Sequence, residues 1–206
     1  MAKKSKITTL FLDIGGVLLT NGWDRQARKD AIRKFSLNPE ETEERHHLTF
    51  DTYEVGKLTL AEYLNRVVFY EKRSFTRSQF RQFMFSKSDP FPEMISMVRA
   101  LKNKYQLKIA VVNNEGKELN EYRIKHFKLN QFVDFFISSC YVHFRKPDPD
   151  IFSVALDIAQ VQAENVLYLE DRLMFIQVAR QHGIIGIHHE KVETTMQKLK
   201  DWNLVL

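Results

Sequence analysis

The second half of the chain alternates between strand-like and helix-like segments, and this alternation constrains the fold more than any other feature. From Pro90 onward, short aliphatic runs are each followed by a segment with apolar residues at helical spacing. Such an alternation predicts a parallel sheet covered by helices on both faces. The predicted elements are, in order, a helix from Pro92, a strand at 107–112, a helix at 116–127, a strand at 133–138, a helix capped by Asp148-Pro149 and running to 160, a strand at 165–169, a helix ending at His182, a strand at 184–187 and a helix at 192–202.

A further strand is predicted near the start of the chain, and it ends on a carboxylate. Residues 7–12 are apolar or β-branched and contain no Gly or Pro, which is typical of a buried strand. Asp13 follows at once, and the pair Gly15-Gly16 lets the backbone turn sharply and approach a ligand closely. Open α/β sheets bind their ligands at the carboxyl ends of their strands. We therefore expect a Rossmann-like α/β fold, with a parallel sheet of about five strands and a site beside Asp13.

Residues 21–89 differ from the second half of the chain, because they show helical patterns and no clear strand. Asn38-Pro39 and Thr59 are typical helix starts, and Glu62 completes a capping box with Thr59. The segment is rich in Phe and Tyr, which favours a small helical core of its own. We expect a helical cap at 21–89, inserted into a core made of residues 1–20 and 90–206. Its aromatic residues are expected to be mainly core, with one or two facing the crevice: Phe50, Tyr53, Phe69 and Phe83.

The composition excludes several classes of protein. A hydrophobic fraction of 44% and a charged fraction of 28% in 206 residues are typical of a soluble globular chain, and no apolar run is long enough to cross a membrane. A single cysteine, Cys140, excludes an intramolecular disulfide and favours the cytoplasm. The net charge of +5 is spread along the chain, so it indicates an anionic small substrate rather than nucleic acid. We expect a monomer or a homodimer.

Polar side chains lie at or just beyond the carboxyl ends of the predicted strands. They are Asp13, Asn113, Asn114, Lys146, Glu170 and Asp171. In a parallel sheet these ends share one rim, where a crevice binds ligands. The three carboxylates form a set of hard oxygen ligands suited to Mg²⁺, the lysine offers a cation to an anionic substrate, and the asparagines offer amide donors. This combination favours phosphoryl transfer, which depends on positioning and charge neutralisation.

Four segments resemble the motifs of the haloacid dehalogenase-like hydrolase superfamily, in the same order and spacing over essentially the whole chain. They are Asp13-Ile14-Gly15-Gly16-Val17-Leu18, Asn113, Arg145-Lys146-Pro147 and Glu170-Asp171. The helical insertion is similar to the small cap of that superfamily. Residues 53–59 are similar to the branch that holds glucose-1-phosphate phosphatases and the N-terminal phosphatase domain of epoxide hydrolases.

The resemblance implies a Mg²⁺-dependent phosphatase that acts on a small phosphate monoester. Asp13 would attack phosphorus to give an aspartyl-phosphate, which water then hydrolyses. Asp13, the Gly15 carbonyl and Asp171 would hold Mg²⁺, with Glu170 in or beside that shell. Lys146 would steady both the nucleophile and the phosphate. The loop Gly15-Gly16, Asn113 and the Asn114 backbone would bind phosphate oxygens.

The chain departs from the family pattern at three places. Gly15 replaces an Asp that serves as general acid and base, which predicts a slow enzyme because such catalysis contributes about 10²–10⁴ in rate. Asn113 replaces Ser or Thr, so its longer side chain either displaces the phosphate or turns away. Met174 and Phe175 stand where a further polar residue is usual, and Arg172 would either bind substrate or compete with the metal.

These departures leave two alternatives open. One is a catalytically degenerate member that binds an anion or a partner protein without turnover. The other is a metal-free haloacid dehalogenase, in which Asp13 attacks carbon. Two histidine pairs, His46-His47 and His188-His189, are interpreted as solvated surface residues, with a cap histidine as a possible replacement proton source.

Overall fold

The computed structural model, which describes residues 6–206, contains one sheet of five parallel strands in the order β3-β2-β1-β4-β5. The strands are β1 (Thr9–Leu12), β2 (Lys108–Asn113), β3 (Phe135–Ser138), β4 (Val166–Glu170) and β5 (Ile185–His188). The helices are α1 (Arg25–Phe35), α2 (Pro39–Glu54), α3 (Leu60–Val67), α4 (Arg77–Phe85), α5 (Pro92–Tyr105), α6 (Lys117–His126), α7 (Ser139–Val142), α8 (Asp150–Ala159), α9 (Leu173–Gln181) and α10 (Val192–Lys200), with short 3₁₀ turns at η1 (Leu129–Gln131) and η2 (Ala163–Asn165). The predicted Rossmann-like fold is confirmed.

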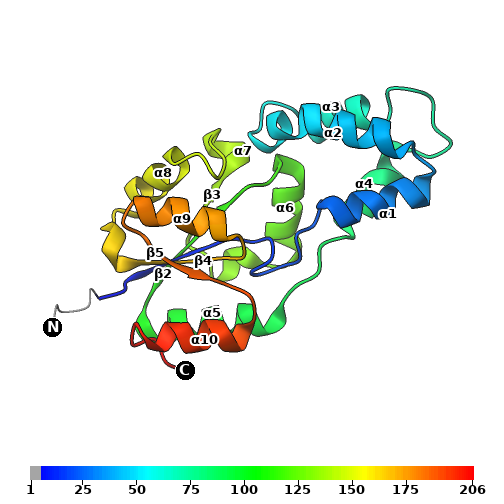
Figure 1. The fold of residues 1–206 in the computed structure, drawn as a ribbon. Coiled ribbons are helices and arrows are strands. Elements are labelled where there is room, and N and C mark those ends of the chain that lie inside the picture. Colours follow the sequence, from blue (N-terminus) through cyan, green and yellow to red (C-terminus); the bar gives the residue numbers. More distant parts are fainter. Residues whose placement is uncertain (1–5) are drawn as a thin grey trace.

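Both faces of the sheet are covered by helices and buried. Successive side chains of each strand point to opposite faces. Leu10 and Leu12 of β1 pack with α5 and α10, whereas Phe11 between them packs with α8 and α9. Figure 1 shows these two helix pairs on opposite sides of the sheet. Burial on both faces explains why the strands are continuous apolar runs.

The order of the strands reverses at β1. The chain places β2 and β3 on one side of β1, and β4 and β5 on the other. Such a switch point opens a crevice at the carboxyl ends of the strands. Asp13, the residue after β1, donates its backbone N–H to the Leu169 carbonyl of β4 at 3.0 Å. The predicted nucleophile therefore lies at the middle of the sheet, at the crevice.

Helices α1 to α4 lie beside the sheet and have a hydrophobic cluster of their own (Figure 1). We call residues 21–89 the four-helix segment. Its helix starts confirm the sequence prediction: Asn38 accepts from the Glu41 N–H, and Thr59 forms a capping box with Glu62. The aromatic residues Tyr53, Tyr63 and Phe80 are fully buried in this cluster. The abundance of Phe and Tyr in the segment thus reflects its core.

The two connections between the sheet and the four-helix segment run side by side. Thr20 donates its N–H to the Asp89 carbonyl at 2.8 Å, and Phe91 donates to the Leu18 carbonyl at 2.9 Å. An antiparallel bridge joins Leu19 to Pro90 between these two bonds. The chain therefore leaves and re-enters the sheet region at one place, next to the end of β1.

Several element boundaries differ from the sequence prediction by one or two residues. Strand β3 begins at Phe135 rather than at Val133, because the Val133 N–H closes the preceding turn on the Leu129 carbonyl. Helix α8 begins at Asp150, and Asp148 accepts from the Asp150 N–H instead of occupying the cap position. Within residues 6–206, none of the helices combines the length and apolar character needed to cross a membrane. Residues 1–5, which we assigned to the core, lie outside the described part.

Candidate active site

Lys146 lies at the centre of a buried cluster of polar groups. Its side chain is 1% exposed, and Nζ lies 2.6 Å from Glu170 Oε2, 3.0 Å from the Tyr168 hydroxyl and 3.2 Å from Asp13 Oδ1. The Tyr168 hydroxyl also donates to Glu170 Oε2. Tyr168 was missed by the sequence analysis, although it lies two residues before Glu170 on β4 and so shares its face of the strand.

Asp13, Glu170 and Asp171 meet as predicted. Each brings a carboxylate oxygen within 4.8 Å of the other two. The Oδ1 atom of Asp171 is buried and has no hydrogen-bond partner in the described part of the chain. A buried, unpaired carboxylate oxygen is costly unless a cation satisfies it. The oxygen ligands present therefore fit a hard divalent cation such as Mg²⁺.

The electrostatics of this cluster indicate a missing positive charge. Burial, together with the charge of Glu170, raises the pKa of Asp13 to about 7. Burial likewise raises the pKa of Asp171 to about 6. For Glu170, burial acts to raise the pKa, but the Lys146 ammonium and several hydrogen bonds bring it below its ordinary value. One lysine thus compensates one of three carboxylates.

Gly16 makes the close approach of Asp171 possible. Its φ is +71°, and a Cβ atom on Gly16 would overlap the Asp171 carboxyl group. Gly15, the first residue of the pair, lines a cavity next to Asp13. Each glycine therefore has its own role: Gly15 forms part of the wall, and Gly16 leaves room for the third carboxylate.

The two asparagines after β2 have different environments, and Asn113 takes the second of the two orientations expected for it. The Asn113 side chain is 1% exposed and is held by Asn120 Oδ1 at 3.1 Å and Ser138 Oγ at 2.7 Å, outside the lining of the cavity. The carboxamide turns away from the position expected for phosphate binding. Asn114 lines the cavity, and its carboxamide bonds both backbone groups of Lys146 at 2.8 Å. Asn114 therefore orients the lysine.

A cavity of about 200 Å³ opens beside Asp13, between the sheet and the four-helix segment. Its size suits a small molecule. Of the four aromatic residues named as candidates for its wall, Phe50 alone lines it, and Trp23, which was not named, lines it as well. The complete lining is Asp13, Gly15, Asn21, Trp23, Asp24, Arg25, Arg28, Phe50, Glu54, Asn114, Glu115, Arg123, Arg145, Lys146, Arg172 and Phe175.

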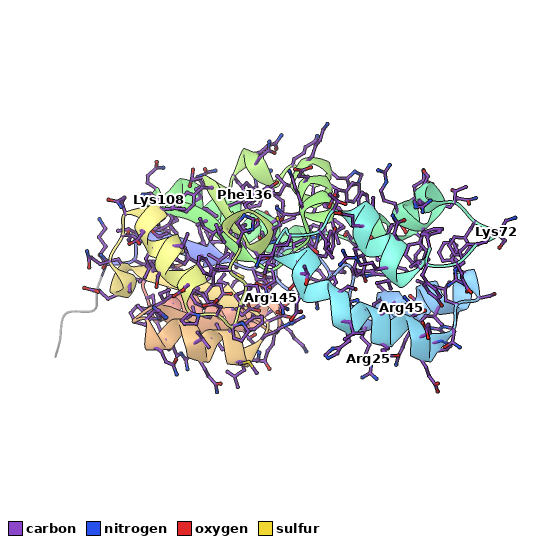
Figure 2. The ribbon with its side chains drawn as sticks, turned by 90° about the horizontal axis from the view of Figure 1, so that it is seen from above. Arg25, Arg45, Lys72, Lys108, Phe136 and Arg145 are labelled. Carbon is purple, nitrogen blue, oxygen red and sulfur yellow. The ribbon has the colours of Figure 1, made fainter. Side chains whose placement is uncertain are left out.

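Arg145, next to Lys146, joins the two parts of the chain. Its guanidinium lies 2.7 Å from Glu54 and 2.5 Å from Asp51, both on α2. Figure 2 shows Arg145 where the core meets the four-helix segment. Burial raises the pKa of Glu54 to about 7, although Arg145 acts to lower it. Sequence reasoning missed Glu54, because nothing in its local pattern distinguishes it from a surface acid.

The histidine interpretation is partly wrong. His46 is buried in the four-helix segment, where its Nδ1 lies 2.8 Å from the Tyr63 hydroxyl, and burial lowers its pKa to about 4. His189 is also buried, and its Nδ1 bonds Thr195 at 2.7 Å. None of the described histidines lines the cavity.

Comparison with known proteins decides the family. A family model described as haloacid dehalogenase-like hydrolase matches residues 26–188, which is most of the chain. The chain belongs to this family. Its curated relatives include the bifunctional epoxide hydrolase 2 of Mus musculus, 30% identical over 62% of the chain, and that of Rattus norvegicus, 29% identical over 59%. These matches cover 24% and 22% of the relatives' length, and they agree with the branch predicted from residues 53–59.

Solved structures of the family share the fold over nearly the whole chain. An enzyme from Bacteroides thetaiotaomicron aligns with a TM-score of 0.81 at 19% identity, covering 95% of this chain and 99% of that one. The same enzyme in complex with magnesium and inorganic phosphate gives 0.77 at 20% identity, covering 92% and 98%. A predicted family hydrolase from Porphyromonas gingivalis gives 0.78 at 17%, covering 96% and 98%.

Proposed function

We propose that the protein is a Mg²⁺-dependent phosphatase that hydrolyses small phosphate monoesters through an aspartyl-phosphate at Asp13. The observation that carries this proposal is the placement of the Asp13 carboxylate, between the Lys146 ammonium at 3.2 Å and the unpaired oxygen of Asp171. A nucleophile, a cation for the phosphate and an unsatisfied metal ligand then converge at the switch point of the sheet.

The two oxygens of Asp13 have different surroundings. Oδ1 accepts from the Ile14 N–H at 2.8 Å and lies 3.2 Å from Lys146 Nζ, whereas Oδ2 has no hydrogen bond within residues 6–206. Oδ2 is therefore the oxygen free to attack. A bond forms from Oδ2 to phosphorus as the bond to the leaving oxygen breaks. Water then attacks phosphorus, which releases inorganic phosphate and restores the carboxylate.

The buried cluster around Lys146 keeps the lysine charged and in place. Burial acts against the ammonium, but Asp13 and Glu170 raise the pKa of Lys146 above its ordinary value. Tyr168, Glu170 and the Asn114 carboxamide restrict its position. The fixed ammonium can therefore stabilise the negative charge on Asp13 before the reaction and the charge on the phosphoryl group during its transfer.

Mg²⁺ would be held by Asp13 and Asp171, with the Gly15 carbonyl and Glu170 in or beside its shell. When bound, it would neutralise the carboxylates and the charge that develops on the phosphoryl oxygens. The chain's own contribution is to collect these oxygens on one rim and to leave room for them at Gly16.

Residues 21–89 are proposed to be the cap of this enzyme. The segment contributes Trp23, Phe50 and Glu54 to the cavity wall, and it is joined to the core by paired connections at Thr20 and Asp89. A cap in this position would exclude water from the phosphorylated nucleophile and select the organic part of the substrate.

The test is release of phosphate from an aryl phosphate, with and without Mg²⁺, by the wild type, Asp13→Asn and Asp157→Asn. Asp157 is exposed on α8 and serves as the matched control. We expect Mg²⁺-dependent release that is lost in Asp13→Asn and retained in Asp157→Asn. An aryl leaving group needs little protonation, so Gly15 does not limit this assay. An inactive wild type would refute the phosphatase, and metal-independent release of halide from 2-haloacids would replace it with a dehalogenase.

A further inference from the structure

The catalytic cavity contains more cationic side chains than one phosphate group needs. Six of its lining residues are cationic, and four are carboxylates. The cationic residues are Arg25, Arg28, Arg123, Arg145, Lys146 and Arg172, and the carboxylates are Asp13, Asp24, Glu54 and Glu115. Which of these cations are already neutralised decides what else the cavity can bind.

Three of the five arginines form ion pairs with carboxylates, and one of them, Arg123, keeps a donor that is not satisfied. Arg28 forms a bidentate pair with Glu43, at 2.9 Å from both Nε and Nη2. Arg145 is paired with Glu54 and Asp51, and Arg123 with Glu115. Within residues 6–206, Asp24 is the lining carboxylate without an ion pair to a cation, and its Oδ1 accepts the Ala27 N–H as the cap of α1.

The other two arginines form no ion pair within residues 6–206, although Arg25 acts to lower the pKa of Glu43 and Arg172 acts to lower that of Asp171. Arg25 begins α1, where the helix dipole disfavours a cation, and no acidic residue occupies that first turn. Arg172 follows β4, and its guanidinium lies 5.5 Å from the centre of the Phe175 ring. Arg25 therefore belongs to the four-helix segment (Figure 2), and Arg172 to the core.

Arg123 gives independent evidence of a ligand. Its side chain is only 2% exposed, although the cavity reaches it. Nη1 pairs with Glu115 and Nη2 donates to the Thr20 carbonyl, whereas Nε is buried and has no hydrogen-bond partner within residues 6–206. A buried guanidinium donor that no protein group satisfies is costly. An anion in this part of the cavity would provide the missing acceptor.

We propose that Arg25, Arg123 and Arg172 form a second anion subsite, and that the substrate carries a carboxylate or a second phosphate besides its phosphate ester. This inference rests on the proposed function, which places the ester phosphate at Asp13. The cavity of about 200 Å³ limits the spacer between the two anionic groups to a few carbon atoms. Trp23 and Phe50 supply apolar wall for that spacer.

The test compares binding of phosphonates that the enzyme cannot hydrolyse. Methylphosphonate, phosphonoacetate and propane-1,3-diphosphonate are titrated into the Mg²⁺-loaded wild type, Arg25→Gln, Arg172→Gln and Lys29→Gln, with heat as the readout. Lys29 is exposed on α1 outside the cavity lining, so its variant removes the same charge from the same helix.

We expect the two probes that carry a second anionic group to bind at least about tenfold more tightly than methylphosphonate. Each arginine variant should reduce that preference about threefold to tenfold, as expected for a charge-assisted contact at a partly exposed site. Lys29→Gln should retain it, and added salt should weaken it in the wild type.

Equal binding of the three phosphonates by the wild type would overturn the subsite. So would a preference that survives in both arginine variants. Because this assay needs no turnover, it separates the two proposals. Phosphate release from an aryl phosphate without a preference for the probes with two anionic groups would refute the subsite alone. That preference without any hydrolysis would support the subsite and refute the phosphatase.

Discussion

Gly15 faces Asn21 in the wall of the catalytic cavity. A Cβ atom on Gly15 would lie 2.8 Å from the Asn21 Oδ1, the end of an exposed side chain that can move aside. Gly15 does not have a positive φ, so its backbone accepts a side chain. The resemblance places a general acid at this position. Gly15 provides no side chain there, although the local backbone would accept one.

Restoring that acid should change the dependence of the rate on the leaving group. We expect Gly15→Asp, made in an Asn21→Ala background, to raise kcat on an alkyl phosphate at least about tenfold, within the range of general acid catalysis. Its effect on an aryl phosphate should be much smaller, because an aryl oxide leaves without a proton. The Asn21→Ala parent is the control. Equal gains on both substrates would contradict a proton-transfer role.

The loop after β1 shapes the proposed metal site through Gly16. Gly16 has φ of +71°, and the Asp171 carboxyl group occupies the space where its Cβ would lie. Gly183, which follows α9, also has a positive φ of +80°, but a Cβ there would meet only Ala163, at 3.3 Å. The two glycines share the backbone requirement and differ in what they touch.

Substituting each of these glycines separates strain from function. Gly16→Ala and Gly183→Ala should both lower the free energy of unfolding by about 1–2 kcal/mol, the cost of a left-handed conformation for a residue with Cβ. Only Gly16→Ala should also weaken Mg²⁺ binding, measured by calorimetry, because it displaces Asp171. Unchanged Mg²⁺ affinity in Gly16→Ala would show that Asp171 does not ligate the ion.

At the scale of the whole molecule, the contact between Arg145 and α2 connects the four-helix segment to the loop that carries Lys146. Glu54 is buried there, whereas Asp51, which binds the same guanidinium, is 73% exposed. Burial raises the pKa of Glu54 from 4.5 to about 7. The folded state therefore holds the Glu54 proton more strongly than the unfolded chain does, and stability must depend on pH.

The sign follows from this raised pKa. Below about pH 4.5, Glu54 is protonated in both the folded and the unfolded state, so it does not make the free energy of unfolding depend on pH. Between pH 4.5 and about 7 the unfolded chain ionises first, and the free energy of unfolding falls as the pH rises. Chemical denaturation at pH 5 and pH 8 should show Glu54→Gln gaining stability relative to the wild type, by at most about 3 kcal/mol. Asp51→Asn, which contacts the same guanidinium and leaves Glu54 in place, is the matched control. A pH-independent difference for Glu54→Gln would exclude a buried, titrating carboxyl group.

Much of the architecture could be predicted from local patterns. Alternating apolar strands and helices indicated the parallel sheet, and capping residues such as Asn38 and Thr59 marked helix starts correctly. Because parallel strands all point the same way, the order of the motifs was enough to gather Asp13, Lys146 and Asp171 on one rim. The ends of strands and helices were harder to predict, because apolar residues such as Val133 form hydrogen bonds in a turn next to the strand.

The sequence by itself determined the fold class, the family and the residues that carry the proposed chemistry, because periodicity and strand-end carboxylates are local properties of the chain. Only the tertiary structure decided where the side chains point. Asn113 turns away because α6 brings Asn120 and β3 brings Ser138 to its carboxamide. The cationic wall of the cavity likewise exists only once α1, α6 and the loop after β4 pack around Asp13, which places Arg25, Arg123 and Arg172 in one cavity.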